Sequence, residues 1–354
     1  MDLGPYQDLP QVLGFNDPKN FSLAKEHLLS SFGRLPSMPE SLEIISETPY
    51  IYDGVEITPI SWWCGYGPRT QGYLVKPQEV KSALPGILYL HSHDDVKEFG
   101  VQKVLDGAGD LPAELAWVKE IHYGGQAPVN ELAKAGFAVL VFDCFLWGSR
   151  RFADEVMPSR LREILQKENY EDLAVMHESM VLSKYLSLFG STLAGLINFD
   201  DRVAMQVLKN LADTTDQIGV VGLSGGGSRA IYLHATNPEI KATVSVGAMA
   251  TYASMLDRHI APHSWMFFPN DLASKLDWPE VAMLGSENSL YVQFCANDQL
   301  FTLAGMQAAD ASLKKHYEKL DSEYKSDFYP VKHSFTTQMQ KDALGWLKKI
   351  LLRD

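Results

Sequence analysis

The hydrophobic pattern of the chain changes near residue 84. From there onward, short apolar or β-branched runs alternate with longer segments of helical periodicity. Most of these runs are continuous, which is typical of strands buried on both faces of a parallel sheet. The runs cover residues 86–90, 137–142, 218–222, 242–246 and 290–294, and a weaker one covers 326–330.

Helix candidates lie between the runs, at residues 129–135, 201–212, 228–236, 303–320 and 336–352. The alternation of strands and helices predicts an α/β fold, with a mostly parallel central sheet flanked by helices on both faces. We expect residues 85–354 to form this core.

Two regions depart from the alternation. Residues 1–84 carry polar and proline-rich stretches, followed by a predicted hairpin at 55–63 and 69–75. We expect an N-terminal lead-in whose antiparallel strands join the sheet edge. Residues 149–198 are helical in pattern and lengthen one crossover between two strands. Such an insertion predicts a cap over a site.

Composition narrows the range of functions. The 354 residues are 46% hydrophobic, which favours a globular protein, and 31 Lys+Arg against 44 Asp+Glu give a net charge of −13. This acidic balance opposes binding to nucleic acid or to anionic membranes. No charge-free apolar window of eighteen residues predicts a membrane span, and the N-terminus does not resemble a secretory signal.

Cysteine usage suggests a reducing compartment. Cys64, Cys144 and Cys295 are odd in number and widely spaced, and each has an aromatic neighbour in the sequence. They are expected to be buried, reduced thiols of a cytoplasmic protein, without a C-x-x-C motif for metal or redox chemistry.

The sharpest motif is Gly222-Leu223-Ser224-Gly225-Gly226-Gly227, between a predicted strand and a predicted helix. A strand that turns abruptly into a helix at a serine strains the backbone, so small residues must flank the serine and its hydroxyl points out at the top of the sheet. The helix N-terminus also favours a developing oxyanion. This context favours a nucleophilic Ser224 over a plain flexible turn or a phosphate loop.

A serine nucleophile requires a base and an orienting acid. Asp298 follows the strand predicted at 290–294, and His333 precedes the terminal helix, so both are expected on loops at the sheet edge that carries Ser224. The order Ser, Asp, His is the one expected of an α/β-hydrolase. His234 and His316 lie inside predicted helices and are poorer bases. Asp298 also has a plainer interpretation, an ordinary turn aspartate.

Further segments of the chain are similar to those of a known enzyme family. They are residues 72–77, His91-Ser92-His93, Phe142-Asp143, Gly148-Ser149-Arg150, residues 198–202, Asn297-Asp298 and Lys332-His333-Ser334-Phe335. Together with the serine motif they resemble the acetyl-xylan-esterase-like and dienelactone-hydrolase-like branch of the α/β-hydrolases, from about residue 50 to the C-terminus. The resemblance implies the α/β-hydrolase fold and a triad of Ser224, Asp298 and His333.

The loop after the first core strand departs from that family. Relatives carry glycines there, and a backbone N–H of the loop completes the oxyanion hole. Here the loop is His91-Ser92-His93-Asp94-Asp95. We therefore expect Gly225 as one oxyanion donor and His93 as the second. Pocket-lining roles are expected for His91, Asp94, Phe145, Trp147 and Glu178, and an aromatic wall could come from residues 265–268, although aromatics also fit an ordinary core.

Two other interpretations compete at this edge. His91, His93 and Asp95 resemble the start of a metallohydrolase site, but such sites continue with a further histidine where this chain has Val96. A hydrogen-bonded histidine at the sheet end explains His91 more simply, and we expect neither metal nor cofactor. Asp143 could be mistaken for the triad acid, but a structural turn is expected, in which Asp143 or Arg150 pairs locally.

These observations predict a cytoplasmic serine hydrolase that cleaves a carboxylic ester through an acyl-enzyme. The net charge disfavours a strongly anionic substrate, so a neutral small-molecule ester, such as a small acyl ester or a lactone, is expected. Three alternatives stay open. They are an amidase, peptidase or carbon–carbon hydrolase with the same triad, a non-catalytic binding protein on the same fold, and a metallohydrolase that uses His91 and His93. The sequence favours no particular oligomeric state.

Overall fold

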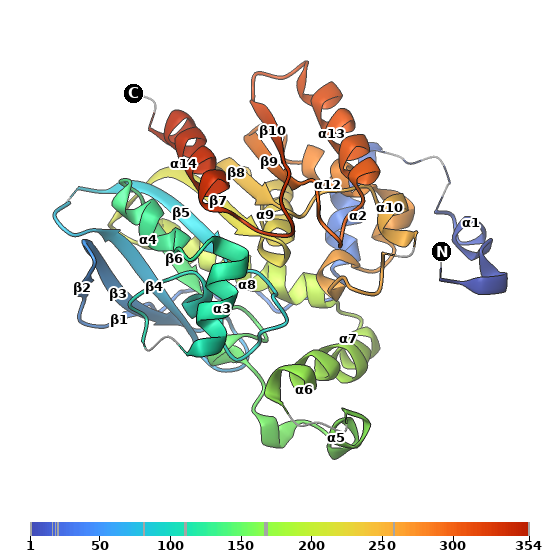
Figure 1. Cartoon of the computed structure of the whole chain (residues 1–354), viewed down its shortest axis with the longest axis horizontal. Helices are drawn as coiled ribbons and strands as arrows, with labels where there is room; N and C mark the ends of the chain where they lie inside the picture. Colours follow the sequence, from blue (N-terminus) through green and yellow to red (C-terminus); the bar gives the residue numbers. More distant parts are fainter. Residues whose placement is uncertain are drawn as a thin grey trace.

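A mixed β-sheet runs through the centre of the computed structural model (Figure 1). The structure describes residues 2–15, 17, 19, 21–80, 82–109, 112–165, 169–257 and 259–352. Within these residues, ten strands pair in the order β1-β3-β4-β6-β5-β7-β8-β9-β10, and β2 pairs with β3. The strands are β1 (Ile45–Ser46), β2 (Tyr50–Tyr52), β3 (Val55–Trp62), β4 (Thr70–Pro77), β5 (Leu84–Leu90), β6 (Ala138–Phe142), β7 (Thr214–Leu223), β8 (Ile240–Val246), β9 (Ser289–Cys295) and β10 (Tyr324–Tyr329).

The sheet has a parallel part and an antiparallel edge. Strands β6, β5, β7, β8, β9 and β10 pair in parallel, in that order. The predicted hairpin is formed by β3 and β4, and β4 joins the parallel part by antiparallel pairing with β6. The prediction of a mostly parallel sheet extended by N-terminal antiparallel strands is therefore confirmed.

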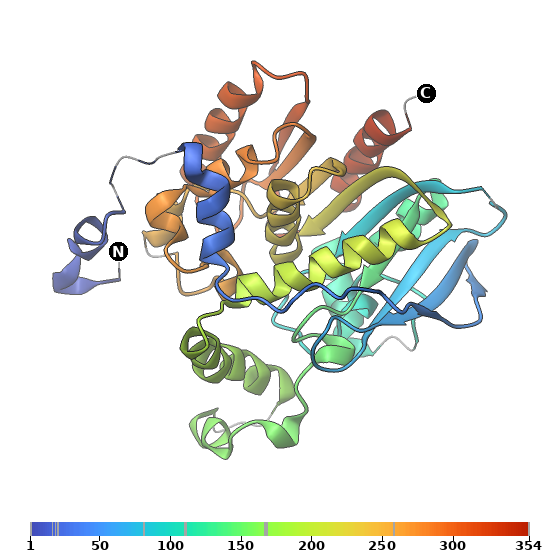
Figure 2. The same ribbon diagram turned by 180° about the vertical axis from the view of Figure 1, so that it is seen from behind.

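Both faces of the parallel strands are covered by helices, which explains their continuous apolar runs. Ile87 and Tyr89 of β5 share a core with α3 (Ala113–Tyr123), α4 (Pro128–Lys134) and α14 (Thr337–Leu351). The alternate residues, Leu88 and Leu90, share a core with α8 (Leu193–Asn210) and α9 (Gly225–Thr236). Figure 1 shows α3, α4 and α14 on the near face, and Figure 2 shows α8 across the opposite face.

The five predicted helices are present, and all but the one predicted from residue 303 begin at a different residue. The helix predicted from residue 201 begins at Leu193, because Thr192 caps it: Thr192 Oγ1 accepts a hydrogen bond from the Gly195 N–H at 3.0 Å. Helix α3 was not predicted. The remaining helices are α1 (Leu9–Val12), α2 (Ala24–Ser31), α5 (Ser159–Leu165), α6 (Tyr170–His177), α7 (Ser183–Leu188), α10 (Tyr252–Leu256), α11 (Leu272–Lys275), α12 (Trp278–Met283) and α13 (Leu303–Tyr317).

The segment between β6 and α8 is helical, as expected. It contains α5, α6, a π-helical turn η6 (Glu178–Leu182) and α7, which project from the body of the protein in Figure 1. Buried apolar residues hold its first half together, namely Met157, Leu161, Leu173 and Ala174. The last residues expected in the insertion instead form the start of α8.

The N-terminal lead-in does more than extend the sheet edge. Helix α2 packs on the opposite face from α14, beside the start of α8 (Figure 2). Thr192 Oγ1 donates a hydrogen bond to Phe32 O at 3.1 Å, and the ring of Phe32 meets that of Tyr232 edge-on at 5.1 Å. The lead-in thus contacts two separate parts of the core.

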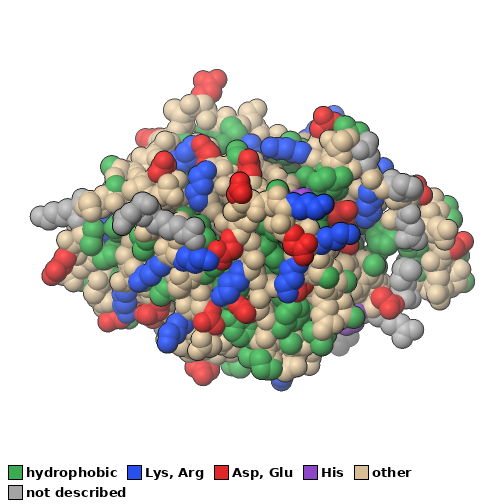
Figure 3. All heavy atoms as spheres, turned by 90° about the horizontal axis from the view of Figure 1, so that it is seen from above, with side chains coloured by type: hydrophobic (Ala, Val, Ile, Leu, Met, Phe, Trp, Pro, Cys, Tyr) green, Lys and Arg blue, Asp and Glu red, His purple; other side chains and the backbone are tan. Residues whose placement is uncertain are grey.

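The three thiols are buried, as their sequence context predicts. Acidic and basic side chains are interspersed on the face in Figure 3. Cys64, Cys144 and Cys295 are buried free thiols. Among the described residues, no helix has the length and apolarity that crossing a bilayer requires.

Candidate active site

Ser224 lies at an abrupt turn between β7 and α9. Its φ of 56° and ψ of −119° are unfavourable for any residue with a side chain. The glycines around it permit close backbone contacts. A Cβ on Gly226 would lie 2.0 Å from Leu90 O, and a Cβ on Gly222 would lie 2.3 Å from the Gly226 backbone. The motif therefore forms the strained strand-to-helix turn that the sequence predicts.

Asp298 and His333 lie on the loops that follow β9 and β10. The buried Asp298 side chain accepts a hydrogen bond from His333 Nδ1 at 2.6 Å, and its other oxygen accepts one from the Leu300 N–H at 2.8 Å. This contact assigns a proton to Nδ1 of the neutral imidazole. His333 Nε2 is buried and has no hydrogen-bond partner within the described part of the chain. Its lone pair is free to accept a proton from a group in the cavity.

Strand pairing brings the two loops together. The Ala296 N–H donates to Tyr329 O at 2.7 Å, and the Asn297 N–H donates to Val331 O at 3.0 Å, which extends the parallel pairing of β9 and β10. Gly247, at the end of β8, has a φ of 54°, and a Cβ there would lie 3.3 Å from His333 Cε1. The imidazole therefore packs against the backbone at the end of the neighbouring strand.

The backbone of His93 lies close to Gly225, the residue that follows Ser224. Gly225 is the first residue of α9, so its N–H has no acceptor within the helix. The N atom of His93 lies 3.3 Å from the position that a Cβ of Gly225 would occupy. No described residue accepts a hydrogen bond from the His93 N–H. Two donors in this arrangement are able to bind an oxyanion next to Ser224.

A cavity of about 470 Å3 contains Ser224, Gly225 and His333. Two of the five expected pocket residues, Asp94 and Glu178, also line it, as does His93, which was expected to be an oxyanion donor. The expected aromatic segment contributes Trp265, Met266 and Phe267, and sequence reasoning missed Trp117, His122, His263 and Ser264. The sequence carried no signal for these four, because they come from two separate segments, α3 and residues 263–264, that only the fold brings together.

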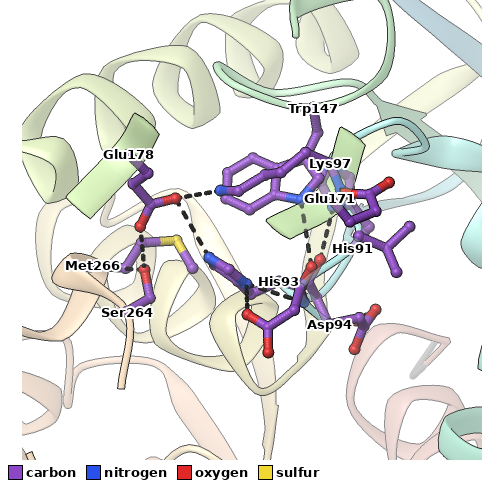
Figure 4. Close-up of polar contacts among 12 residues, drawn as sticks. His91, His93, Asp94, Lys97, Trp147, Glu171, Glu178, Ser264 and Met266 are labelled. Atoms are coloured by element: carbon purple, nitrogen blue, oxygen red, sulfur yellow. Dashed lines mark hydrogen bonds and ion pairs between the residues drawn. The ribbon is translucent and has the colours of Figure 1, made fainter. Parts of the chain in front are cut away.

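Glu178, in the π-helical turn η6, forms the polar wall of the cavity (Figure 4). One of its carboxylate oxygens forms an ion pair with Lys97 and lies 3.3 Å from His93 Nε2, and the other accepts from Ser264 Oγ at 3.3 Å. Burial alone would raise the pKa of Glu178, but the charge of Lys97, with a further contribution from His93, holds that pKa well below its ordinary value. Glu178 is therefore a buried, ionised carboxylate.

His93 and Lys97 are each fixed from a second side. His93 Nδ1 accepts from the Asp95 N–H at 3.1 Å, which directs its Nε2 proton at Glu178. The Nζ atom of Lys97 lies 3.4 Å from the centroid of the Trp147 ring, in cation–π contact. Lys97 is buried, although Asp95 and Glu98 beside it in the sequence are charged residues typical of a surface.

Comparison with known proteins decides the fold. No family model matches the sequence. A glucuronoyl esterase from Solibacter usitatus is similar in structure, with a TM-score of 0.61 and 15% identity over 94% of this chain and 93% of the other. Acetyl xylan esterase 1 from Thermoanaerobacterium sp. JW/SL YS485 gives a TM-score of 0.53 and 14% identity over 94% of both chains. The chain has the α/β-hydrolase fold.

The resemblance found in the sequence is thereby confirmed at the level of the fold. A match in sequence is YtaP of Bacillus subtilis (strain 168), a protein described as an inferred hydrolase. It is 22% identical over 290 residues, which cover 80% of this chain and 84% of YtaP.

Three residues expected in the pocket lie outside the cavity lining. His91 is buried behind it, with Nε2 3.6 Å from Cys144 Sγ. Trp147 supports the loop after β5, since its Nε1 donates to His93 O at 3.4 Å. Phe145 packs its ring against Tyr66, and its N–H donates to Asp200 at 2.9 Å. The side chains of Phe145 and Trp147 instead pack into the core on the α8 side of the sheet.

Asp143 has the structural role that was expected. Its two carboxylate oxygens accept hydrogen bonds from the Val101 N–H at 2.9 Å and from the Ser149 N–H at 2.8 Å. Arg150 pairs at a distance in sequence instead, with Asp200 at 3.3 Å.

His91 and His93 do not converge on a common point. The ring of His91 faces Cys144, whereas that of His93 faces Glu178. Among the residues that the structure describes, no group of three or more His, Cys, Asp or Glu side chains is arranged to hold a metal ion.

Proposed function

We propose that this protein is a serine hydrolase that cleaves carboxylic esters through an acyl-enzyme. The observation that carries the proposal is the free Nε2 of His333, whose Nδ1 is held by Asp298 and which shares a cavity with Ser224. Similarity to two structures named as esterases supports the ester as the bond that is cleaved.

In the proposed reaction, Ser224 Oγ attacks the ester carbonyl while His333 Nε2 takes its proton. Asp298 stabilises the imidazolium, and the N–H groups of Gly225 and His93 bind the oxyanion. The C–O bond then breaks, and His333 protonates the departing alcohol. Water gives a proton to His333 as it attacks the acyl-enzyme, which releases the carboxylic acid and restores the Ser224 hydroxyl. These steps require no metal or organic cofactor.

The size and the lining of the cavity favour a small, uncharged substrate. Its volume of about 470 Å3 is in the range of small-molecule sites. Its described lining includes Asp94, Asp95 and Glu178 but no lysine or arginine that would bind a substrate carboxylate. A neutral ester needs no such cation.

A fluorophosphonate probe tests the nucleophile. We expect the wild-type protein to be labelled and to release acid from short-chain esters, and we expect Ser224→Ala to lose both properties. Ser179→Ala is the matched control, because Ser179 is an exposed serine that lines the same cavity, and this variant should keep the label. Equal labelling of Ser224→Ala would refute the assignment. Faster cleavage of the matched amides than of the esters would move the proposal to an amidase.

A further inference from the structure

A buried lysine holds the loop after β5 from behind. Lys103, in the 3-10 turn η3 (Val101–Lys103), is fully buried. Its Nζ donates to Ser92 O at 2.6 Å, to His93 O at 3.2 Å and to Val96 O at 3.3 Å. The Asp94 carboxylate, 3.4 Å from Nζ, balances its charge. Since an ammonium has three N–H donors, the three carbonyl oxygens account for all of them. The charge of Lys103 is therefore directed at the loop.

One peptide group connects Lys103 to the cavity. The carbonyl of Ser92 and the N–H of His93 belong to the same peptide, which is trans, because the described residues contain no cis peptide bond. In a trans peptide the C=O and N–H bonds point in opposite directions. With its oxygen on Lys103, the peptide directs the His93 N–H away from the ammonium. Gly225 lies near that N atom, with its Cβ position at 3.3 Å.

The same contacts fix a loop that contains no glycine. Asp94 and Asp95 have φ angles of 55° and 52°, in the left-handed region that glycine adopts most readily. Lys103 binds the carbonyl oxygens of His93 and Val96, on either side of these two residues. The ammonium thus clamps the strained segment at both ends.

We propose that Lys103 is a positioning residue of the oxyanion hole. It orients and polarises the Ser92–His93 peptide so that the His93 N–H binds the developing oxyanion; the inference rests on the proposed ester hydrolysis at Ser224. A cation on the carbonyl oxygen strengthens the N–H of that peptide as a donor. The oxyanion exists only after Ser224 has attacked, so Lys103 acts on kcat rather than on substrate binding.

Three variants test this role with a short-chain ester. We expect Lys103→Met to lower kcat by about 100-fold, the usual effect of losing one oxyanion donor, and to change KM by less than about 3-fold. Lys103→Arg should recover about 10-fold of that loss, because a guanidinium also donates to carbonyl oxygens. Lys119→Met is the matched control. Lys119 is also a buried lysine, but it donates to Leu105 O at 3.3 Å, in a different loop. The kcat of the Lys119→Met variant should therefore match that of the wild type.

The outcomes separate this inference from the proposed function. If the wild type neither hydrolyses esters nor reacts with the fluorophosphonate, the proposed function fails. The role of Lys103 is refuted, and the proposed function is not, if the wild type is active and a folded Lys103→Met variant has the kcat of the wild type. The same conclusion follows if the variant has a lower kcat/KM only because its KM is higher.

A second measurement decides the case in which Lys103→Met does not fold. In a crystal structure of the wild type phosphonylated at Ser224, we expect the phosphonyl oxygen within about 3 Å of His93 N, with Lys103 still bound to Ser92 O. A phosphonyl oxygen that contacts neither His93 N nor its peptide would overturn the proposal.

Discussion

Replacing Glu178 by glutamine should leave the charge of Lys97 buried without a counter-ion. The two side chains form an ion pair and are 4% and 2% exposed, respectively. At an effective dielectric constant of about 20, opposite charges 4 Å apart attract by about 4 kcal/mol. Breaking a buried pair on one side typically costs about 3–5 kcal/mol. We therefore expect Glu178→Gln to lower the free energy of unfolding by about 3–5 kcal/mol at pH 7.

The loss should shrink at alkaline pH, because Lys97 can release its proton instead of staying charged. From the ordinary lysine pKa of 10.5, neutralising the amine costs about 5 kcal/mol at pH 7 and about 2 kcal/mol at pH 9. The loss of stability caused by a buried Lys97 charge without a counter-ion cannot exceed this cost of neutralising the amine. The difference in stability between wild type and Glu178→Gln should therefore be clearly smaller at pH 9.

Urea denaturation followed by tryptophan fluorescence measures both effects. Lys97→Met/Glu178→Gln should recover at least half of the lost stability, since the double variant strands no charge. Glu239→Gln, which breaks the partly exposed pair with Lys209, is the control and should cost less than about 1 kcal/mol. The reasoning is wrong if Glu178→Gln costs no more than this control, or if the double variant is as unstable as the single one.

Four other substitutions have defined outcomes. Asp298→Asn replaces the carboxylate that stabilises the imidazolium, so kcat for esters should fall by about 10³- to 10⁴-fold; an unchanged kcat in steady-state assays would contradict the triad. A Cβ added at Gly345 in α14 meets open space, so Gly345→Ala should raise the free energy of unfolding by about 0.5–1 kcal/mol. A Cβ added at Gly226 would lie 2.0 Å from a carbonyl oxygen of β5, so Gly226→Ala should prevent stable folding. A thermal unfolding experiment in which Gly226→Ala is more stable than Gly345→Ala would refute this reasoning. Burial lowers the pKa of His234 to about 4. Between pH 6.5 and pH 4 the unfolded chain therefore binds a proton at His234 that the folded chain does not. The free energy of unfolding should accordingly fall by about 2 kcal/mol from pH 7.5 to pH 5. His234→Gln should remove this part of the pH dependence, as seen in urea midpoints at the two pH values, and an unaltered slope would show that His234 is not its source.

The fold was predictable because its signals are local. A strand buried on both faces needs apolar residues at every position, so the run at 86–90 identified β5 without knowledge of its neighbours. The motif around Ser224 was equally local, since the glycines permit contacts within a single turn. The start of α8 was misplaced because Gly195 lowers the helix propensity of its first turn, whereas packing against α2 and the sheet stabilises the helix there.

The polar wall of the site was not predictable, because its burial depends on distant segments. Lys97 and Lys103 lie in a stretch that also contains Asp94, Asp95 and Glu98, a pattern that normally indicates a solvated surface. Lys97 is buried by Glu178 and Trp147, which lie about 80 and 50 positions away in the sequence. No periodicity within the loop carries that information.

The loop after β5 lacks the glycines that the family resemblance implies, and buried cations bind its carbonyl oxygens. Without glycine, Asp94 and Asp95 adopt left-handed conformations that cost on the order of 1 kcal/mol each. Buried cations hold the loop in return: Arg229 donates to His91 O at 3.0 Å, and Lys103 donates to the next two carbonyl oxygens. Each of these contacts fixes one side of a peptide whose other side carries an N–H. A loop fixed in this way presents its donors without rearrangement during the reaction, and electrostatic stabilisation of an oxyanion depends on that property.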